Sequence, residues 1–344
     1  MRDAASPATL DELDLALVNS LQISPRAPWT EIAGALGVDA ATAARRWERL
    51  RAGGYAWVTA YPYDEFGSGA LIEVDCAPGQ DRTVAEALAQ EPMAATVELT
   101  AGGRDLLVTA IARDYTSLTR FVLDRVGVLP GITSTRAHLV TGSAYAEGSA
   151  WRLRSLTPAQ QKALTGSRRS TRDQGGTPPG DHRALMLALG EDGRASLTDL
   201  AADLEVSVNT VSRRLKRLID SGSLVLRCDL APQLSGSPVS VTFFASVASE
   251  HLNSTARAIA RFPEIRLCVG VAGPQNLLAT AWVASLADVH LLEVRLASAL
   301  PHLQIADRSV CLRRIKHVGR LLNEQGRAIG FVPVDLWADS AGAC

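Results

Sequence analysis

The sequence predicts an α+β chain made of two copies of one unit, each a winged helix-turn-helix domain followed by a ferredoxin-like βαββαβ domain. Residues 196–218 have the pattern of two short helices joined by a tight turn. Residues 29–50 repeat that pattern without a gap, at an offset of 168 positions that takes Thr30 to Thr198. After each copy, strands and helices alternate in the same order. The predicted helix-turn-helix domains cover residues 9–61 and 181–229, and the predicted βαββαβ domains cover residues 69–142 and 237–319. A linker at residues 143–180 joins the two copies, and residues 320–344 form a tail.

The second helix pair has the features of a DNA-reading head. Ser196 and Ser207 are positioned to cap its two helices, and Val211, Leu215 and Leu218 form the apolar stripe of the second one. Amide, hydroxyl and cationic groups occupy the remaining faces, where they suit base edges and phosphates. The predicted DNA-contacting residues are Ser207, Asn209, Thr210, Ser212, Arg213, Lys216 and Arg217.

The first copy has a weaker version of this surface. Its matching polar residues are Thr42, Arg45, Arg46 and Arg49. Ala41 and Glu48 stand where the second copy has Asn209 and Lys216, and they offer little to a base or a phosphate. Basic residues on an outer helix face are often only a solvated surface. The helix-turn-helix spacing and its repetition favour DNA binding here, with the second head supplying most of the specificity.

Composition limits the class of protein. The chain has 344 residues, 47% of them hydrophobic and 21% charged, which is enough apolar material for two or more cores. A net charge of -1 excludes a globally basic nucleic-acid coat but allows local readout. The five cysteines are far apart, so we expect neither a disulfide framework nor a metal site. No apolar run has a membrane-spanning length and no secretory signal is visible, so we expect a cytoplasmic protein without cofactor.

The βαββαβ order follows from alternating periodicities. In the first copy we expect strands at 71–76, 93–100, 105–112 and 132–141, with helices at 83–90 and 116–126. In the second we expect strands at 239–247, 265–271, 276–284 and 305–318, with helices at 254–261 and 286–300. Both helices of such a unit cover one face of its sheet. The bare face predicts a partner sheet, and therefore association.

Two segments lie outside the repeat. Between Trp151 and Arg172 there are six cations and no acid, and residues 166–180 are polar and rich in Gly and Pro. This linker is read as a flexible tether or as an arm that touches DNA phosphates, with a short helix possible from Pro158. In the tail, residues 329–334 could form an edge strand, which Pro333 would limit.

Two groups of motifs resemble the leucine-responsive/asparagine-responsive regulator (Lrp/AsnC) family in a tandem form. They are residues 204–207 with 213–218 in the second head, and the turns 102–105 and 273–276 of the βαββαβ domains. The resemblance implies domains paired sheet to sheet, with small effectors, commonly amino acids, bound where they meet. It places Gly102, Asp105, Gly273 and Asn276 near such a pocket.

The two turns depart from the family pattern. Arg104 and Gln275 replace a frequent aromatic residue, and Asn276 replaces the acid. Both loops can also be read as tight turns that use Gly for its positive φ.

A tandem chain would be its own pseudo-dimer. We therefore expect double-stranded DNA with two unequal half-sites as partner, a possible amino-acid-like effector, and homo-oligomers of pseudo-dimers. The alternative is a tetrapyrrole decarboxylase of the sirohaem type, which shares this fold. The six histidines are scattered and no catalytic motif is present, so no catalytic residue is assigned. A third reading is an architectural DNA binder that ignores sequence.

Overall fold

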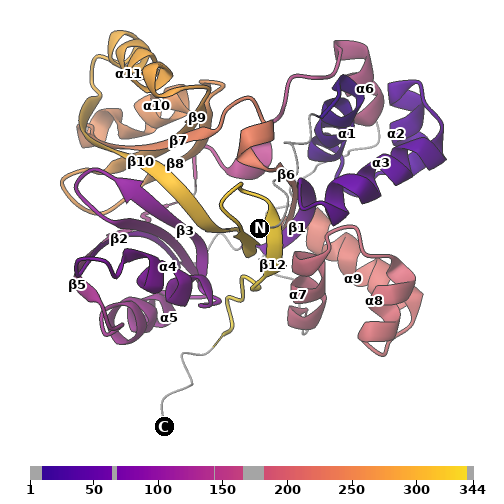
Figure 1. The fold of residues 1–344 in the computed structure, drawn as a ribbon, viewed down its shortest axis with the longest axis horizontal. Coiled ribbons are helices and arrows are strands. Elements are labelled where there is room, and N and C mark those ends of the chain that lie inside the picture. The colour runs from indigo at the N-terminus through magenta and orange to yellow at the C-terminus, as the bar shows by residue number, and fades with distance from the viewer. Residues whose placement is uncertain (1–9, 64–67, 143, 166–181, 339–344) are drawn as a thin grey trace, which may run out of the picture.

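A computed structural model describes residues 10–63, 68–142, 144–165 and 182–338. Figure 1 shows two helical heads on one side of the molecule and two βαββαβ domains on the other, as the repeat predicts. The first head contains α1 (Glu12–Ile23), α2 (Trp29–Leu36) and α3 (Ala40–Ala52). The second contains α7 (Arg183–Glu191), α8 (Leu197–Asp203) and α9 (Val208–Asp220).

The predicted helix caps are confirmed. Ser196 Oγ accepts from Asp199 N at 3.0 Å at the start of α8, and Ser207 Oγ accepts from Thr210 N at 3.2 Å at the start of α9. These bonds satisfy amide donors that a helix leaves open at its first turn. The sequence positions of the two caps therefore fix where both helices begin.

An antiparallel ribbon joins the two heads. Strand β1 (Ala56–Pro62) follows α3, strand β6 (Leu224–Leu230) follows α9, and Thr59 pairs directly with Arg227. The repeat offset of 168 makes these two residues equivalent. Because two equivalent residues face each other only at a two-fold axis, the pseudo-two-fold axis of the molecule passes through this pair.

A reciprocal pair of arginines fixes the heads to each other. Arg26, in the α1–α2 turn, donates to the carbonyls of Gly193 at 2.6 Å and Ala195 at 2.9 Å. Its equivalent Arg194 donates to the carbonyls of Pro25 at 2.6 Å and Ala27 at 3.0 Å. Burial lowers the pKa of both guanidiniums, that of Arg194 to about 10, so both stay charged at neutral pH.

The two βαββαβ domains share one continuous sheet of order β5-β2-β4-β3-β10-β7-β9-β8. The strands of the first domain are β2 (Ser68–Cys76), β3 (Ala94–Ala101), β4 (Leu106–Ala112) and β5 (Ile132–Leu139). Those of the second are β7 (Val239–Ser246), β8 (Ile265–Gly270), β9 (Leu277–Val283) and β10 (Gln304–His317). β10 pairs with β7 along its first half and with β3 along its second half.

The bare faces of the two halves of this sheet, one from each βαββαβ domain, cover each other, as predicted. Leu71 and Leu107 of the first domain share a buried cluster with Phe244, Val269 and Leu278 of the second. The outer faces are covered by α4 (Asp81–Ala89) and α5 (Tyr115–Arg120) in one domain, and by α10 (Ser249–Ile259) and α11 (Leu286–Ala299) in the other. The partner sheet that the sequence predicts for each bare face is therefore supplied by the other domain of the same chain.

The tether interpretation is wrong for residues 144–165. A 3₁₀ turn (Gly148–Ala150) and helix α6 (Pro158–Thr165) lie in this segment. Leu153, Leu156 and Leu164 are buried in the core of the first head. Their burial depends on contact with a distant part of the chain, which the composition of the segment does not reveal. The rest of the predicted linker, residues 143 and 166–180, lies outside the described residues.

The tail carries more structure than the sequence indicated. Strands β11 (Arg320–Leu322) and β12 (Ala328–Phe331) extend the sheet beside β10, and Pro333 lies beyond them. Asp335 accepts from Arg183 of the second head at 2.5 Å. The tail therefore connects the second head to the sheet.

Helix boundaries differ in two places. The predicted helix 116–126 is α5 followed by a π-helical turn (Phe121–Val126), in which Phe121 and Val126, five residues apart, both reach the core. Helix α10 begins at Ser249, five residues before the expected start. Among the described residues, no helix is long and apolar enough to cross a membrane.

Candidate nucleic-acid interface

Helix α9 presents the predicted polar surface to solvent. Val211 and Leu218 are fully buried on its inner face, which fixes the rotation of the helix about its axis. Thr210 is half-buried, and its hydroxyl lies 2.9 Å from that of Ser207. The other predicted residues are all exposed: Ser207, Asn209, Ser212, Arg213, Lys216 and Arg217.

The cations of α9 differ in their contacts. Lys216 pairs with Asp220 one turn further along the helix, an exposed contact that another anion can replace. Within the described part of the chain, Arg213 and Arg217 form no ion pair. Both guanidiniums are therefore available to an external anion such as a phosphate.

The matching cations of α3 are engaged within the protein. Asp14 of α1 accepts from Arg46 at 2.9 Å and from Arg49 at 2.5 Å. Thr42 donates to its own cap residue Asp39 at 2.7 Å. Arg45 is exposed and keeps an outward position. The structure thus leaves the first head with fewer cations free for DNA than the second.

One substitution between the copies explains this difference. The repeat offset makes His182 the equivalent of Asp14. His182 is buried, and neither of its ring nitrogens has a hydrogen-bond partner among the described residues. Because the second head has no carboxylate at this position, Arg217 is not drawn back toward the helix bundle as Arg49 is.

The four predicted effector residues lie in two equivalent turns. Gly102 and Gly273 have φ values of 119° and 131°, which only glycine adopts easily. Asp105 accepts from Cys76 N at 2.7 Å, and Asn276 accepts from Val247 N at 2.9 Å. Each side chain thus connects its turn to the end of the neighbouring strand. None of the four residues lines the cavity described next.

A cavity of about 250 Å³ lies between the two sheets beside the β1–β6 ribbon. Its charged and aromatic lining comes mainly from the second copy, with Arg227 on β6, Arg266 on β8 and Arg314 on β10. Sequence reasoning missed this cluster because no motif marks it. The available signal was the presence of charged residues inside strands predicted to be buried. Its charged, histidine and aromatic lining residues are Tyr61, Tyr63, Glu98, Glu147, Arg227, Arg266, Trp282, Arg314 and His317.

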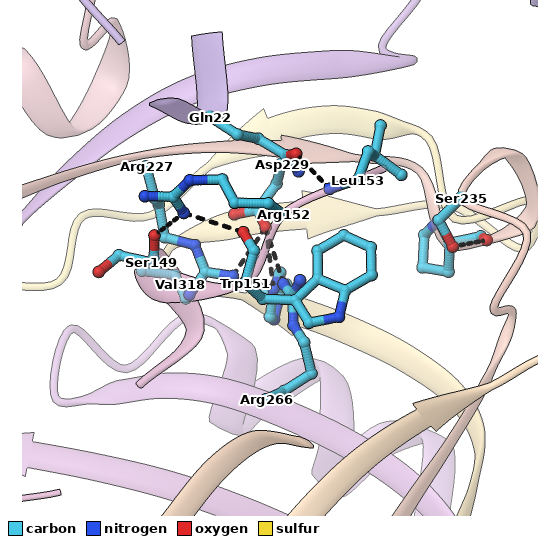
Figure 2. Close-up of polar contacts among 12 residues, drawn as sticks. Gln22, Ser149, Trp151, Arg152, Leu153, Arg227, Asp229, Ser235, Arg266 and Val318 are labelled. Atoms are coloured by element: carbon cyan, nitrogen blue, oxygen red, sulfur yellow. Dashed lines mark hydrogen bonds and ion pairs between the residues drawn. The ribbon is translucent and has the colours of Figure 1, made fainter. Parts of the chain in front are cut away.

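Two of these arginines share one carboxylate. Asp229 Oδ1 accepts from Arg227 at 2.7 Å and from Arg266 at 3.3 Å (Figure 2). The Arg266 guanidinium lies 3.8 Å from the ring centroid of Trp282 and 4.4 Å from that of Trp151. Burial and the nearby Arg227 charge lower the pKa of Arg266 to about 9. Besides sharing Asp229, Arg227 has a second carboxylate nearby, with its Nη1 4.0 Å from Glu147 Oε1.

Arg314 and His317 complete the cluster. Glu98 Oε1 accepts from Arg314 Nε at 2.8 Å and from Nη2 at 2.5 Å. Burial and the Arg314 charge lower the pKa of His317 to about 3, so its ring is neutral at physiological pH. Within the described ranges, no group of His, Cys, Asp and Glu could hold a metal ion.

Comparisons with known proteins agree with this architecture. Residues 10–51 match the AsnC-type helix-turn-helix domain, residues 69–149 the Lrp/AsnC ligand binding domain, and residues 182–222 a winged helix-turn-helix DNA-binding domain. An uncharacterized HTH-type transcriptional regulator of Pyrococcus abyssi is 31% identical over 136 residues, 38% of this chain and 86% of that protein. One of Pyrococcus furiosus is 32% identical over 136 residues, 38% of this chain and 92% of that protein.

Solved structures of one enzyme resemble nearly the whole chain in fold. The siroheme decarboxylase NirDL superposes with a TM-score of 0.57 and 13% sequence identity, covering 92% of this chain and 96% of that chain. That likeness concerns the fold alone. The domain matches and the regulator relatives show that the chain belongs to the Lrp/AsnC family of helix-turn-helix transcriptional regulators.

Proposed function

We propose that this regulator reads double-stranded DNA through two unequal heads on one polypeptide, with α9 supplying most of the specific contacts. The observation that carries the proposal is the contrast between the two reading helices. Arg49 is held by Asp14, whereas Arg217 faces solvent beside Arg213 and Asn209. A guanidinium that is free of internal partners can contact a guanine edge or a phosphate without first breaking an ion pair.

The operator follows from the pseudo-two-fold axis. A pair of heads related by a two-fold axis binds two half-sites about one helical turn, or a multiple of it, apart. Because the heads differ at Asp14 and His182, and at Ala41 and Asn209, the two half-sites should differ as well. The proposed operator is an imperfect palindrome.

For effector binding, we propose that the family-type turns act where βαββαβ domains of different chains meet. Gly102 and Asp105 in one turn, and Gly273 and Asn276 in the other, leave exposed backbone at equivalent corners of the molecule. The proposed ligand is an amino acid or a related metabolite. Calorimetry with a panel of amino acids tests this, and no heat with any of them would refute the amino-acid assignment.

The proposed homo-oligomer uses the outer helices. Tyr115 and Leu123 are 64% and 62% exposed, and their equivalents Leu286 and Val294 are 66% and 49% exposed. Equivalent apolar patches on both copies suit contacts between pseudo-dimers in a closed assembly. Light scattering should then give a mass above one chain, and Leu123→Glu with Val294→Glu should reduce it to that of one chain.

The runner-up function is a tetrapyrrole decarboxylase, favoured by the likeness in fold to NirDL. The histidine of the cavity argues against it. His317, with a pKa of about 3, is a weak candidate for a general acid. Incubation with sirohaem and mass analysis should give unchanged substrate, and loss of CO₂ would favour the enzyme.

The regulator proposal is tested by capturing genomic fragments on the full chain and measuring affinities at fixed salt. Captured fragments should bind more tightly than random duplexes of the same length. Arg213→Ala should cost about 1 to 3 kcal/mol on such a fragment. The matched variant Arg45→Ala, at the equivalent position of the first head, should cost less. Equal losses would refute the asymmetry, and equal affinity for random DNA would favour an architectural binder.

A further inference from the structure

We propose that the cavity on the pseudo-two-fold axis is a binding site for a small organic acid, one carboxylate on a short apolar or aromatic body, held by Arg227 and Arg266. This site is distinct from the two family-type turns. It also differs from them in number, because only one copy of the repeat supplies the charges, so each chain has one such site.

The fold does not need the positive charges of Arg227 and Arg266. The pairing registers show that the first copy has Thr59 in place of Arg227, Ala95 in place of Arg266, and Ile111 in place of Trp282. The same strands therefore pack without buried guanidiniums in the other domain. A buried ion cluster is weak evidence for stability because desolvation offsets much of the attraction. Its presence in one copy only points to a ligand.

The geometry presents cations to the cavity. Arg266 occupies a β-bulge between Ile265 and Leu267, and such an irregularity re-aims a side chain. The two indoles of Trp151 and Trp282 hold its guanidinium (Figure 2 shows Arg266 beside Trp151). Arg and aromatic side chains together suit a carboxylate attached to a flat apolar group.

Buried donors remain open next to these cations. Arg227 Nε has no hydrogen-bond partner among the described residues. His317 Nε2 lies 3.3 Å from Arg227 Nη2, so the neutral ring accepts there and carries its proton on Nδ1, which is also unpartnered in the described ranges. A buried donor without a partner is costly. The cluster thus leaves two buried donors unsatisfied in residues that line the cavity.

The nearby carboxylates are already engaged. Glu98 accepts twice from Arg314, and Glu147 accepts from Tyr61 and from Ser149 N at 2.9 Å. Glu147 Oε1 also lies 4.0 Å from Arg227 Nη1, so Arg227 is shared between Glu147 and Asp229, while Arg266 pairs with Asp229 alone among the described residues. The opposite wall of the cavity is apolar, with Leu71, Ala95, Ala110, Ile111 and Val140 from the first copy. A small anion with an apolar end matches both walls.

The site connects to the heads through the ribbon. Tyr61 and Arg227 line the cavity from β1 and β6, and these strands lead back to α3 and α9. If the proposed DNA reading holds, a ligand that orders this end of the ribbon should alter DNA affinity. Binding of the acid itself is independent of that function.

The test is calorimetry on the full chain without DNA, using benzoate, phenylacetate and indole-3-acetate, their neutral amides, and inorganic phosphate. At least one acid should bind saturably at one site per chain, with no heat from its amide. No heat from any acid, equal binding of the amides, or binding of phosphate alone would overturn the proposal.

Variants locate the binding. Arg266→Gln should weaken the acid at least about tenfold by removing a charge-assisted contact. Ile111→Trp fills the apolar wall, keeps every charge, and should abolish binding, so a folding failure of Arg266→Gln leaves the proposal testable. Arg104→Gln is the matched control, because Arg104 is buried against Glu73 outside the cavity. Loss of binding in the control, or none in Ile111→Trp, would overturn the site.

A second experiment takes the acid that binds in calorimetry and adds it to the protein bound to a captured DNA fragment. A changed DNA affinity connects the cavity to the heads. An acid that binds without changing DNA affinity keeps the site and refutes the connection. Failure to retain any fragment counts against the proposed function and leaves the calorimetric result standing.

Discussion

At the scale of single residues, one position separates the two heads. Asp14 is almost completely buried and holds both Arg46 and Arg49, while its equivalent His182 holds no cation among the described residues. The number of cations that reach phosphates determines the slope of affinity against salt. The asymmetry of DNA reading should therefore respond to this residue although it makes no contact with DNA itself.

His182→Asp should retract Arg217 and weaken DNA binding. The slope of log K against log salt on a captured fragment should shrink by roughly one unit, the effect of one lost phosphate contact. Titrations at several salt concentrations measure this. The matched variant Asp14→His should change the slope in the opposite direction. An unchanged slope in His182→Asp would show that Arg217 does not reach the backbone.

Two neighbouring glycines of α2 should respond in opposite ways to alanine. Gly34 lies inside the helix with nothing within 4 Å of an added Cβ, so Gly34→Ala should stabilise by roughly 0.5 to 1 kcal/mol. Gly37 ends the helix at φ 71°, where an L side chain is strained, so Gly37→Ala should destabilise by about 1 kcal/mol. Chemical unfolding compares them, and equal effects would contradict the left-handed turn.

Lys316 gives the stability of the protein a pH dependence. It is fully buried, with Nζ donating to Glu91 O at 2.9 Å, and burial lowers its pKa to about 7. Between pH 7 and the ordinary lysine pKa, the unfolded chain binds this proton and the folded chain does not. Stability from this group therefore rises with pH above about 7. Thermal unfolding should show a rise from pH 7 to 9 that Lys316→Met lacks; parallel curves would contradict the shift.

At the scale of elements, the sequence predicts the repeat well and the inter-domain contacts poorly. Ser196, Ser207 and the apolar stripe of α9 suffice to place the second head, because caps and helical periodicity are local. β10 pairs with strands of both domains, and residues 144–165 fold onto the first head. Both depend on contacts between distant segments, which local patterns do not encode. The arginine cavity was missed for the same reason.

The reciprocal hydrogen bonds of Arg26 and Arg194 should determine the spacing of the heads. Wild-type protein should lose affinity when roughly five base pairs, about half a helical turn, are inserted between the half-sites. Arg26→Ala with Arg194→Ala removes four hydrogen bonds between the heads and should tolerate the insertion better. Binding assays on both duplexes measure this. Identical sensitivity in the variant would show that the β1–β6 ribbon alone sets the spacing.

At the scale of the whole molecule, duplication makes one chain serve as a dimer. The β1–β6 ribbon and the reciprocal bonds of Arg26 and Arg194 obey the same pseudo-two-fold relation. Fusion also permits the two halves to differ, which identical subunits cannot do. The second copy carries both the exposed cations of α9 and the cavity arginines, while most of their equivalents in the first copy are neutral or engaged, Arg45 being the exposed exception. One chain can thereby combine an asymmetric DNA surface with a single central cavity.

The most direct test of this account is a footprint of the full chain on a captured genomic fragment. The account predicts two protected half-sites about one helical turn or a multiple apart, with Arg213→Ala removing protection from one half-site first. A single protected half-site, or uniform protection without sequence preference, would contradict the account.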